Sequence, residues 1–188
     1  MCPEKKVVGS IADIEQKPRN KFFAVRHGQS ENNVTDILNS DLSKNFHLTE
    51  KGRGNAENAG KNLSKERIDV IVSSPFTRTK ETAEIIAEKI GYSKDNIIYD
   101  NRLHEINFGV CDGKKLDEYL AYFKDRPRED IFTFAPEGSE NRQQVKDRVA
   151  TVLKELDTMH EGKNILVVSH EGVIWGMVSA AEALDVGG

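Results

Sequence analysis

The residues of this chain that are best suited to chemistry follow a short apolar run near its start. The run Phe22–Val25 has strand character, and Arg26, His27 and Gly28 come directly after it. In such a strand, Arg26 and His27 lie at the carboxyl end, where open α/β sheets place their ligand crevices. An arginine offers a planar fork of donors to a phosphate group, and a neutral imidazole nitrogen is a good nucleophile near pH 7. The segment therefore predicts a phosphoryl-transfer site in which His27 is the nucleophile.

Two further segments end in residues that complement this chemistry. Arg78 follows the β-branched run at 69–74 and offers a second fork of donors to a doubly charged phosphoryl group. His170 directly follows the apolar run at 164–169, so we expect it to lie beside His27. Taken singly, each of these residues more often has a structural role, such as an exposed ion pair. The functional interpretation is favoured because both histidines and both arginines are expected at sheet ends.

Strand and helix patterns alternate along the chain, and these elements must position the reactive side chains. Apolar runs predict strands at about 21–26, 69–74, 96–100 and 164–169. Helical spacing of apolar residues predicts helices at about 49–65, 77–90 and 139–159. Thr49 is the expected N-cap of the first helix, and Gly91 is the expected C-cap of the second. This alternation favours an α/β three-layer sandwich with a mainly parallel central sheet and helices on both faces.

Two parts of the chain fall outside this alternation. Residues 1–20 are expected to form an N-terminal extension, in which the run at 7–11 is a candidate edge strand. Residues 111–137 mix basic and aromatic side chains, and we expect a small cap insertion there, over the carboxyl edge of the sheet. The predicted organisation is therefore an extension followed by one domain over 21–188 that contains the cap.

The composition excludes several classes of protein. The 188 residues suit one domain, and 37% hydrophobic with 31% charged residues indicate a soluble globular protein. The formal net charge of −4 argues against binding to nucleic acid or to anionic membranes. No window holds the roughly 20 apolar residues that a membrane span needs. Cys2 and Cys111 are the only cysteines, which fits a reducing compartment, so the expected location is cytoplasmic.

Segments with the motifs of one family occur in that family's order along the chain. They are Arg26–Ser30 with Asn33, the helix start Leu48–Gly52, Ser73–Thr79, Leu103–Gly109 with Gly113, the segment from Pro136 to Arg148, and Val168–Gly172. Together they resemble the histidine phosphatase superfamily, in its phosphoglycerate-mutase-like branch. The resemblance covers about residues 21–180 and implies that family's fold for the domain.

The resemblance also implies roles for the residues that bind and receive the phosphoryl group. His27 would attack the phosphorus atom, and Arg26 and Arg78 would bind its oxygens. In the family's arrangement His170 helps to hold the same oxygens, as an imidazolium. With these cations in place no metal ion and no cofactor are expected, and the remaining histidines lack the spacing of zinc ligands: His47, His104 and His160.

Further matching residues would protonate the leaving group and complete the substrate cradle. Glu105 resembles the family's proton donor, which needs a pKa raised toward neutrality and can later activate water. Ser30, Asn33 and backbone N–H groups near Gly172 would complete the cradle. Glu171 departs from the pattern, because a carboxylate facing the site would repel phosphate; we expect its side chain to point away.

Three functions remain open at this stage. The favoured one is a metal-independent phosphomonoesterase that forms a phosphohistidine intermediate on a small phosphorylated metabolite. A phosphoglycerate mutase-type phosphotransferase would use the same residues, although His170-Glu171-Gly172-Val173 differs from the mutases' His-Gly-Asn-Ser pattern. A non-catalytic module that binds phosphorylated ligands would need neither the nucleophile nor the acid. The expected partner is a small-molecule phosphate ester, without nucleic acid or membrane, and a homodimer is left open.

Overall fold

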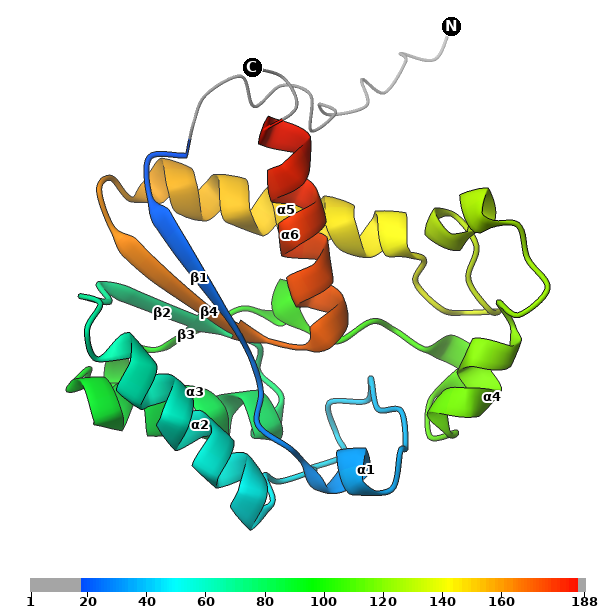
Figure 1. The fold of residues 1–188 in the computed structure, drawn as a ribbon, viewed down its shortest axis with the longest axis horizontal. Helices are drawn as coiled ribbons and strands as arrows, with labels where there is room; N and C mark the ends of the chain where they lie inside the picture. The colour runs from blue at the N-terminus through cyan, green and yellow to red at the C-terminus, as the bar shows by residue number, and fades with distance from the viewer. Residues whose placement is uncertain (1–17, 186–188) are drawn as a thin grey trace, which may run out of the picture.

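A four-stranded parallel sheet lies at the centre of the computed structural model, which describes residues 18–185 (Figure 1). The strands are β1 (Lys21–Arg26), β2 (Val70–Ser73), β3 (Ile98–Tyr99) and β4 (Asn164–Ser169). Their order across the sheet is β1-β4-β2-β3, so that β4, the last of these four strands along the chain, lies between β1 and β2. The candidate strand at 7–11 lies outside the described residues.

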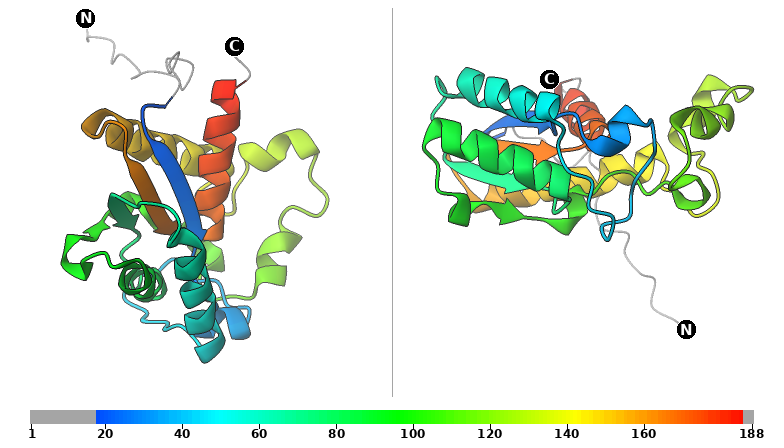
Figure 2. Two further views of the ribbon diagram at one scale, coloured as in Figure 1. Left: turned by 60° about the vertical axis from the view of Figure 1, so that its left-hand side comes forward. Right: turned by 90° about the horizontal axis from the view of Figure 1, so that it is seen from below.

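The two faces of the sheet are covered by different pairs of helices (Figure 2). Helices α2 (Glu50–Leu63) and α3 (Thr77–Ile90) cover one face, where the strands contribute Ile71, Leu166 and Val168 to the core. Helices α5 (Arg142–Met159) and α6 (Glu171–Asp185) cover the other face, where the strands contribute Val70, Val72, Ile165 and Val167. Alternate residues of β2 and β4 thus face opposite layers, as expected of strands buried on both sides. The predicted α/β three-layer sandwich is confirmed.

Local sequence signals explain where these elements begin and end. The hydroxyl of Thr49 accepts a hydrogen bond from the N–H of Gly52 and caps α2, and Gly91 ends α3 in the left-handed conformation. Several boundaries differ from the prediction, two of them with a clear local cause. Helix α5 begins at Arg142 rather than near 139, because Asn141 is its N-cap. Strand β3 has two residues instead of about five, because the 3-10 turn η2 (Lys94–Asn96) precedes it and Asp100 caps a second one, η3 (Asn101–Leu103), immediately afterwards.

The end of the predicted N-terminal extension is packed against α5. The side-chain amide of Asn20 donates to the carboxylate of Asp157 at 2.9 Å and to the carbonyl oxygen of His160 at 2.9 Å. Its own carbonyl accepts from the N–H of Lys163 at 2.9 Å. Asn20 is buried, so these bonds fix the chain at the point where it enters β1.

Residues 111–137, which we call the outer lobe, lie to one side of the sandwich (Figures 1 and 2). They contain α4 (Leu116–Ala121) and the 3-10 turn η5 (Arg128–Phe132). A chain of aromatic contacts at 5.1–5.3 Å between ring centroids joins the lobe to the sandwich through Phe108, Tyr119, Phe123 and Phe134. This is the segment predicted to form a cap insertion.

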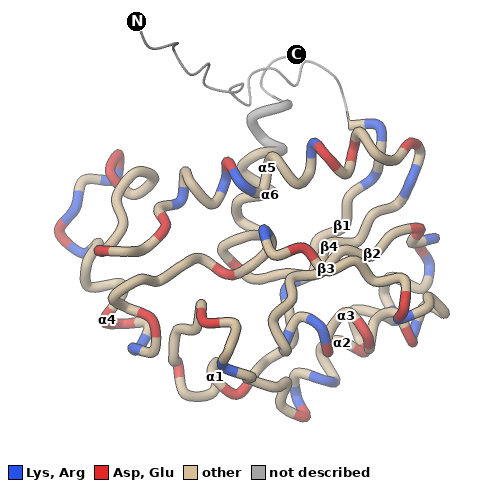
Figure 3. Tube along the Cα trace, turned by 180° about the vertical axis from the view of Figure 1, so that it is seen from behind, with Lys and Arg blue, Asp and Glu red and all other residues tan. Residues whose placement is uncertain are grey.

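The remaining short elements are α1 (Glu31–Val34) and η4 (Gly109–Cys111). Figure 3 shows basic and acidic residues interspersed along the coloured part of the chain. No helix among residues 18–185 has the length and apolar character to cross a membrane.

Candidate active site

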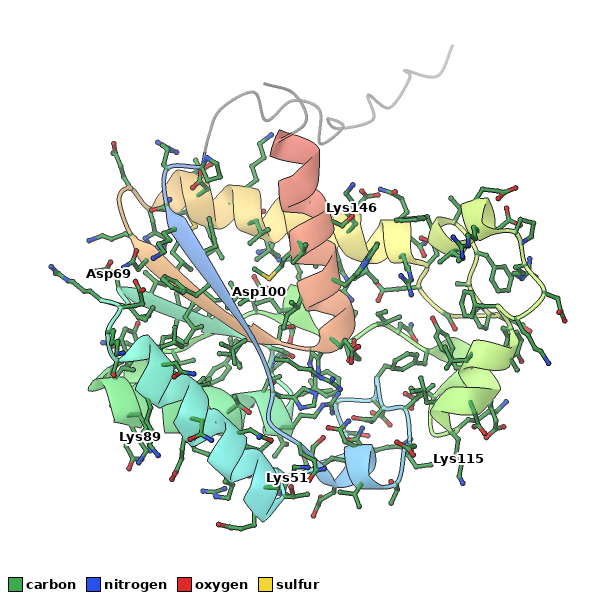
Figure 4. The ribbon with its side chains drawn as sticks, viewed as in Figure 1. Lys51, Asp69, Lys89, Asp100, Lys115 and Lys146 are labelled. Carbon is green, nitrogen blue, oxygen red and sulfur yellow. The ribbon has the colours of Figure 1, made fainter. Side chains whose placement is uncertain are left out.

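A cavity of about 510 Å³ opens where β1 and β4 end, between the sheet, α1 and α4. In Figure 4 the labelled Lys115 marks the residue before α4, on the far side of this region from the strands. The predicted site residues that line the cavity are Arg26, His27, Asn33, Arg78, Glu105 and Gly172. His170 and Ser30 are fully buried and contact lining residues instead.

The sheet register brings the two histidines together. Arg26 is paired with Ser169 across β1 and β4, so His27 and His170 leave the sheet from adjacent positions. Their ring centroids are 5.2 Å apart. The expectation that His170 lies beside His27 is confirmed.

The ring of His27 is held in a neutral, nucleophilic form. Its Nδ1 lies 2.8 Å from the carbonyl oxygen of Gly28, which can only accept, so Nδ1 carries the proton. Nε2 is therefore unprotonated, and it accepts a 3.3 Å hydrogen bond from Nε of Arg78. Burial first, and then the positive charge of Arg78, lowers the pKa of His27 to about 3. At neutral pH the lone pair of Nε2 is available for attack once a substrate oxygen takes over the bond from Arg78.

The loop that carries His27 is fixed by close backbone packing. A Cβ at Gly28 would lie 2.2 Å from the carbonyl oxygen of Gly52 at the start of α2, so no side chain fits there. The N–H of Gly28 donates to the hydroxyl of Thr82 at 3.1 Å, and that hydroxyl donates to the carbonyl of Arg78 at 2.7 Å. The loop of His27 and the backbone of Arg78 are thus tied to the same helix, α3.

Arg78 is a buried cation at the centre of the site, with 2% of its surface exposed. Its Nη1 donates to Oδ1 of Asn39 at 2.8 Å, and its Nη2 donates to the carbonyl oxygen of Asn39 at 3.1 Å. Burial lowers the pKa of Arg78 to about 10, which still leaves the guanidinium charged at neutral pH. A fixed, dehydrated guanidinium of this kind binds phosphate oxygens strongly.

The hydrogen bonds of His170 are those of a neutral ring, and the imidazolium expected around a transferring phosphoryl group stays a prediction. Its Nδ1 lies 3.3 Å from Nη2 of Arg78, which can only donate, so Nδ1 is the acceptor and Nε2 carries the proton toward the hydroxyl of Ser74 at 2.9 Å. Burial, with the charge of Arg78 next, lowers the pKa of His170 well below its ordinary value. A bound phosphoryl group would bring negative charge next to the ring and act in the opposite direction.

Glu105 lies close to His170, and little of its side chain is exposed to solvent. Its Oε1 accepts from the N–H of Ile106 at 2.9 Å, and its Oε2 is 3.8 Å from Nδ1 of His170. Burial raises the pKa of Glu105 above its ordinary value, although nearby arginines oppose the shift. Gly172 makes this position possible, because a Cβ there would lie 2.5 Å from the side chain of Ile106 and 3.1 Å from Oε1 of Glu105. A carboxyl with a raised pKa is suited to donate a proton.

The loop that carries Glu105 is held by an ion pair that the sequence analysis did not assign to the site. Arg148 of α5 donates to both carboxylate oxygens of Glu140, at 2.8 and 2.9 Å. Arg148 also donates to the carbonyl of Arg102 at 2.7 Å, and Glu140 accepts from the N–H of Asn107 at 2.9 Å. These bonds clamp the loop on both sides of Glu105.

The side chain of Glu171 points into the site, and the expectation that it points away is wrong. Its carboxylate lies 2.6 Å from Nη1 of Arg26, and both residues line the cavity. The physical reason is that Arg26 ends β1 and Glu171 begins α6 at the same edge of the sheet, so the carboxylate lies next to the guanidinium. The two side chains are 48% and 71% exposed, so the pair is weak and a phosphate can replace the carboxylate.

Asn33 and Ser30 have different relations to the cavity. Asn33 lines it, and its Oδ1 accepts from the backbone N–H of Ser30 at 3.0 Å, which leaves its amide N–H groups for a ligand. The hydroxyl of Ser30 is 2.8 and 2.9 Å from the Oδ1 atoms of Asn32 and Asn33. Ser30 is therefore placed to orient Asn33 and is absent from the cavity wall, contrary to its expected substrate contact.

Three buried polar residues of the site were missed by the sequence analysis: Asn39, Ser74 and Thr82. Ser74 lies inside the motif Ser73–Thr79, four residues before Arg78, so its position in the sequence could have identified it as a site residue. Asn39 lies in a polar loop with no periodic pattern, so only its burial against Arg78 reveals it.

These groups can act together on a phosphate ester. The site offers an unprotonated ring nitrogen, two guanidinium groups, a second imidazole and a carboxyl with a raised pKa. Within residues 18–185, no group of three or more His, Cys, Asp or Glu side chains is arranged to hold a metal ion. The fold and the site together define a class of α/β protein whose side chains are suited to phosphoryl transfer.

Comparison with known proteins identifies the family. Residues 22–188 match the histidine phosphatase superfamily (branch 1), and the chain belongs to this family. The enzyme is accordingly a phosphatase of the histidine phosphatase type.

Relatives and solved structures agree with this assignment. Phosphoglycerate mutase-like protein 4 of Arabidopsis thaliana is 32% identical over 90% of this chain and 74% of its own length. Phosphoserine phosphatase 1 of Hydrogenobacter thermophilus is 31% identical over 88% of this chain and 78% of its own. A mycobacterial glucosyl-3-phosphoglycerate phosphatase, solved with VO3, has a TM-score of 0.72 and 28% identity, and covers 84% of this chain and 78% of its own.

Proposed function

We propose that the protein is a metal-independent phosphomonoesterase that acts on a small phosphorylated metabolite through a phosphohistidine intermediate. The observation that carries the proposal is the state of His27, a buried neutral ring whose unprotonated Nε2 faces the buried Arg78. Metal independence rests on the positive charge that Arg26 and Arg78 supply around the phosphoryl group.

In the first step, Nε2 of His27 attacks the phosphorus atom, and the bond between phosphorus and the ester oxygen breaks. Arg26 and Arg78 bind the phosphoryl oxygens, and His170 accepts a hydrogen bond from Arg78. Protonated Glu105 gives its proton to the leaving oxygen, so an alcohol departs and a phosphohistidine remains.

In the second step, the carboxylate of Glu105 takes a proton from a water molecule that attacks the phosphohistidine. The bond between phosphorus and Nε2 breaks, and inorganic phosphate is formed. His27 is again neutral and Glu105 is again protonated, so the cycle can repeat without an external acid or base.

A mutase-type phosphotransfer is the second candidate, because one of the relatives is named as phosphoglycerate mutase-like. It would begin with the same phosphohistidine and end with transfer to a second hydroxyl group instead of water. Release of inorganic phosphate separates the two outcomes. A pure binding module is disfavoured, because it would need neither a neutral nucleophile nor an acid.

The test is a phosphate-release assay with nitrophenyl phosphate in excess chelator, combined with a rapid acid or base quench. We expect turnover with chelator and an adduct that is stable in base and labile in acid. His27→Ala should lose the adduct and reduce turnover by about 10⁴-fold or more. His47→Ala is the matched control, because His47 is exposed and pairs with Glu81 outside the cavity. Activity that vanishes with chelator and returns with a metal ion would reject metal independence.

A further inference from the structure

One half of the cavity is not used by the proposed reaction. We call it the outer cavity and define it by six lining residues, from the α1–α2 loop, α4, α5 and α6: Ile37, Leu116, Tyr119, Leu120, Arg142 and Trp175. It adjoins the outer lobe and faces the reactive residues across the same 510 Å³ space.

Arg142 is the cation of the outer cavity. It is the first residue of α5, it is exposed, and its guanidinium carbon lies 5.0 Å from the centre of the Trp175 ring. The other arginines named in the site already have partners, since Arg26 pairs with Glu171 and Arg78 bonds to Asn39. Arg142 makes no ion pair or hydrogen bond with the described part of the chain, so its donors are free for a ligand.

Trp175 and Tyr119 present two more donors in the same place. Trp175 has Phe132 on one side, at 5.6 Å between ring centroids, and Arg142 on another. Tyr119 is close enough to Arg142 for that charge to lower its pKa, against the larger effect of burial. Neither the indole N–H nor the phenol O–H has an acceptor among the described residues. Three donor groups without acceptors thus share one region of the cavity.

Apolar side chains line the same cavity as these donors. Leu116 and Leu120 of α4 line the cavity with 44% and 53% of their surfaces exposed. Exposed leucines beside a ligand cavity gain by burial against an apolar or flat molecule. Asp36 and Glu171 also line the cavity, and their carboxylates repel any negative charge of a ligand that does not lie next to Arg142.

We propose that the outer cavity binds the organic part of the phosphate ester, and that this part has an apolar body ending in one anionic group that pairs with Arg142. The anionic group is a carboxylate or a second phosphate, which offer the same acceptor chemistry to a guanidinium. This substrate class rests on the proposed function for its other end, the phosphoryl group at His27.

The test compares aryl phosphates that differ only in the distal group. The probes are biphenyl-4-yl phosphate, its 4′-carboxy derivative and its 4′-phosphate derivative, with one-ring analogues to vary the reach. In the wild type, kcat/KM for an anionic ester should exceed that for the neutral ester by about tenfold, the effect of one charge-assisted hydrogen bond. Arg142→Gln should make kcat/KM equal for the anionic and neutral esters. The anionic ester with the higher kcat/KM in the wild type identifies the distal group.

Arg126→Gln is the matched control for the charge. Arg126 stacks on Phe134 in the outer lobe, at 3.2 Å from the guanidinium carbon to the ring centre, and it does not line the cavity. It should keep the wild-type ratio, and thermal melting should show that both variants fold. Equal kcat/KM for neutral and anionic esters, or a ratio that survives Arg142→Gln, would overturn the proposed subsite.

A second readout separates this proposal from the proposed function. Trp175 is the only tryptophan of the chain, so its fluorescence reports ligand binding in the outer cavity without any turnover. The 4′-carboxy ester should change this fluorescence with a dissociation constant that rises about tenfold in Arg142→Gln. If no ester releases phosphate while this dependence holds, the proposed reaction fails and the anion subsite stands. If phosphate is released and the dependence is missing, the subsite fails and the reaction stands.

Discussion

The two halves of the cavity differ in how their side chains are held. In the half around His27, Arg78 is 2% exposed and bonds to Asn39 and to both histidines. In the outer cavity, leucines are about half exposed and Arg142 rests on Trp175 without a hydrogen-bonding partner among the described residues. The first half is organised before any ligand arrives, whereas the second gains its contacts from the ligand.

This difference corresponds to the two ends of a phosphate ester. The phosphoryl group is the same in every substrate, so the groups that act on it can be fixed by buried bonds. The organic part differs from substrate to substrate, and it meets the outer lobe, whose leucines Leu116 and Leu120 are about half exposed. Changes in the inner half should therefore alter the chemical step, and changes in the outer half should alter selectivity.

Glu105→Gln should give the largest effect, and it depends on the leaving group. The variant keeps the size of the side chain but cannot donate a proton in the same way. Formation of phosphohistidine from an alkyl phosphate should slow by about 10²–10⁴-fold, because an alkoxide cannot leave unprotonated. Nitrophenyl phosphate should lose much less. Single-turnover adduct formation is the measurement, since the second step also uses Glu105; equal losses with both esters would remove Glu105 as the acid.

Arg78→Lys should have the next largest effect, a reduction of kcat/KM by about 10²-fold for every ester. Lysine keeps the charge but cannot bond to Asn39 and face the phosphoryl group with a planar fork. Because the loss concerns the shared phosphoryl group, the ratio between neutral and anionic esters should stay constant. Arg67→Lys is the control, because Arg67 is exposed on the surface. A near wild-type value for Arg78→Lys would place phosphate binding elsewhere.

Leu120→Ala should have a smaller effect that is confined to the organic part. It removes apolar surface from the outer cavity, so KM for biphenyl-4-yl phosphate should rise by less than about tenfold. Inhibition by inorganic phosphate, which occupies only the inner half, tests the contrast between the halves. Val110→Ala provides the control, since Val110 is 43% exposed but does not line the cavity. A loss of phosphate affinity in Leu120→Ala would break the division between the halves.

The last prediction concerns protonation, where we expect that His27 and His170 do not titrate in the usual range of a histidine. Burial lowers the pKa of His27 to about 3, so its ring should stay neutral from pH 8 down to pH 5, and burial lowers the pKa of His170, so its ring should titrate below the usual histidine range. His47 is the internal control, because its bond to Glu81 raises its pKa and it should take up a proton in the upper part of that range. Ring resonances in an NMR titration measure all three. A His27 that titrates near pH 6.5 in the ligand-free protein would contradict the neutral nucleophile.

The strands and the cavity-facing motif residues were predictable from the sequence, because each depends on a local signal. The run before Arg26 and the run before His170 gave strands with the predicted boundaries, and parallel pairing then placed their carboxyl ends together. Asn39 was not predictable, since its role depends on burial by segments that are distant along the chain. The direction of Glu171 was mispredicted for a related reason. A carboxylate at this position repels a phosphate, but it also attracts the guanidinium of Arg26, which comes from a segment distant along the chain.

The position of β4 has a consequence for how the chain folds. Of the described strands, β4 is the last to be synthesised, yet it supplies the only sheet partner of β1 and one of the two partners of β2. His27 thus leaves the ribosome long before residues 164–169, and its strand cannot join the sheet until they arrive. Pairing between segments so distant in sequence is slow. We expect turnover after refolding to return with the slowest change in Trp175 fluorescence, and full activity before that change would show that β1 is ordered without its neighbour.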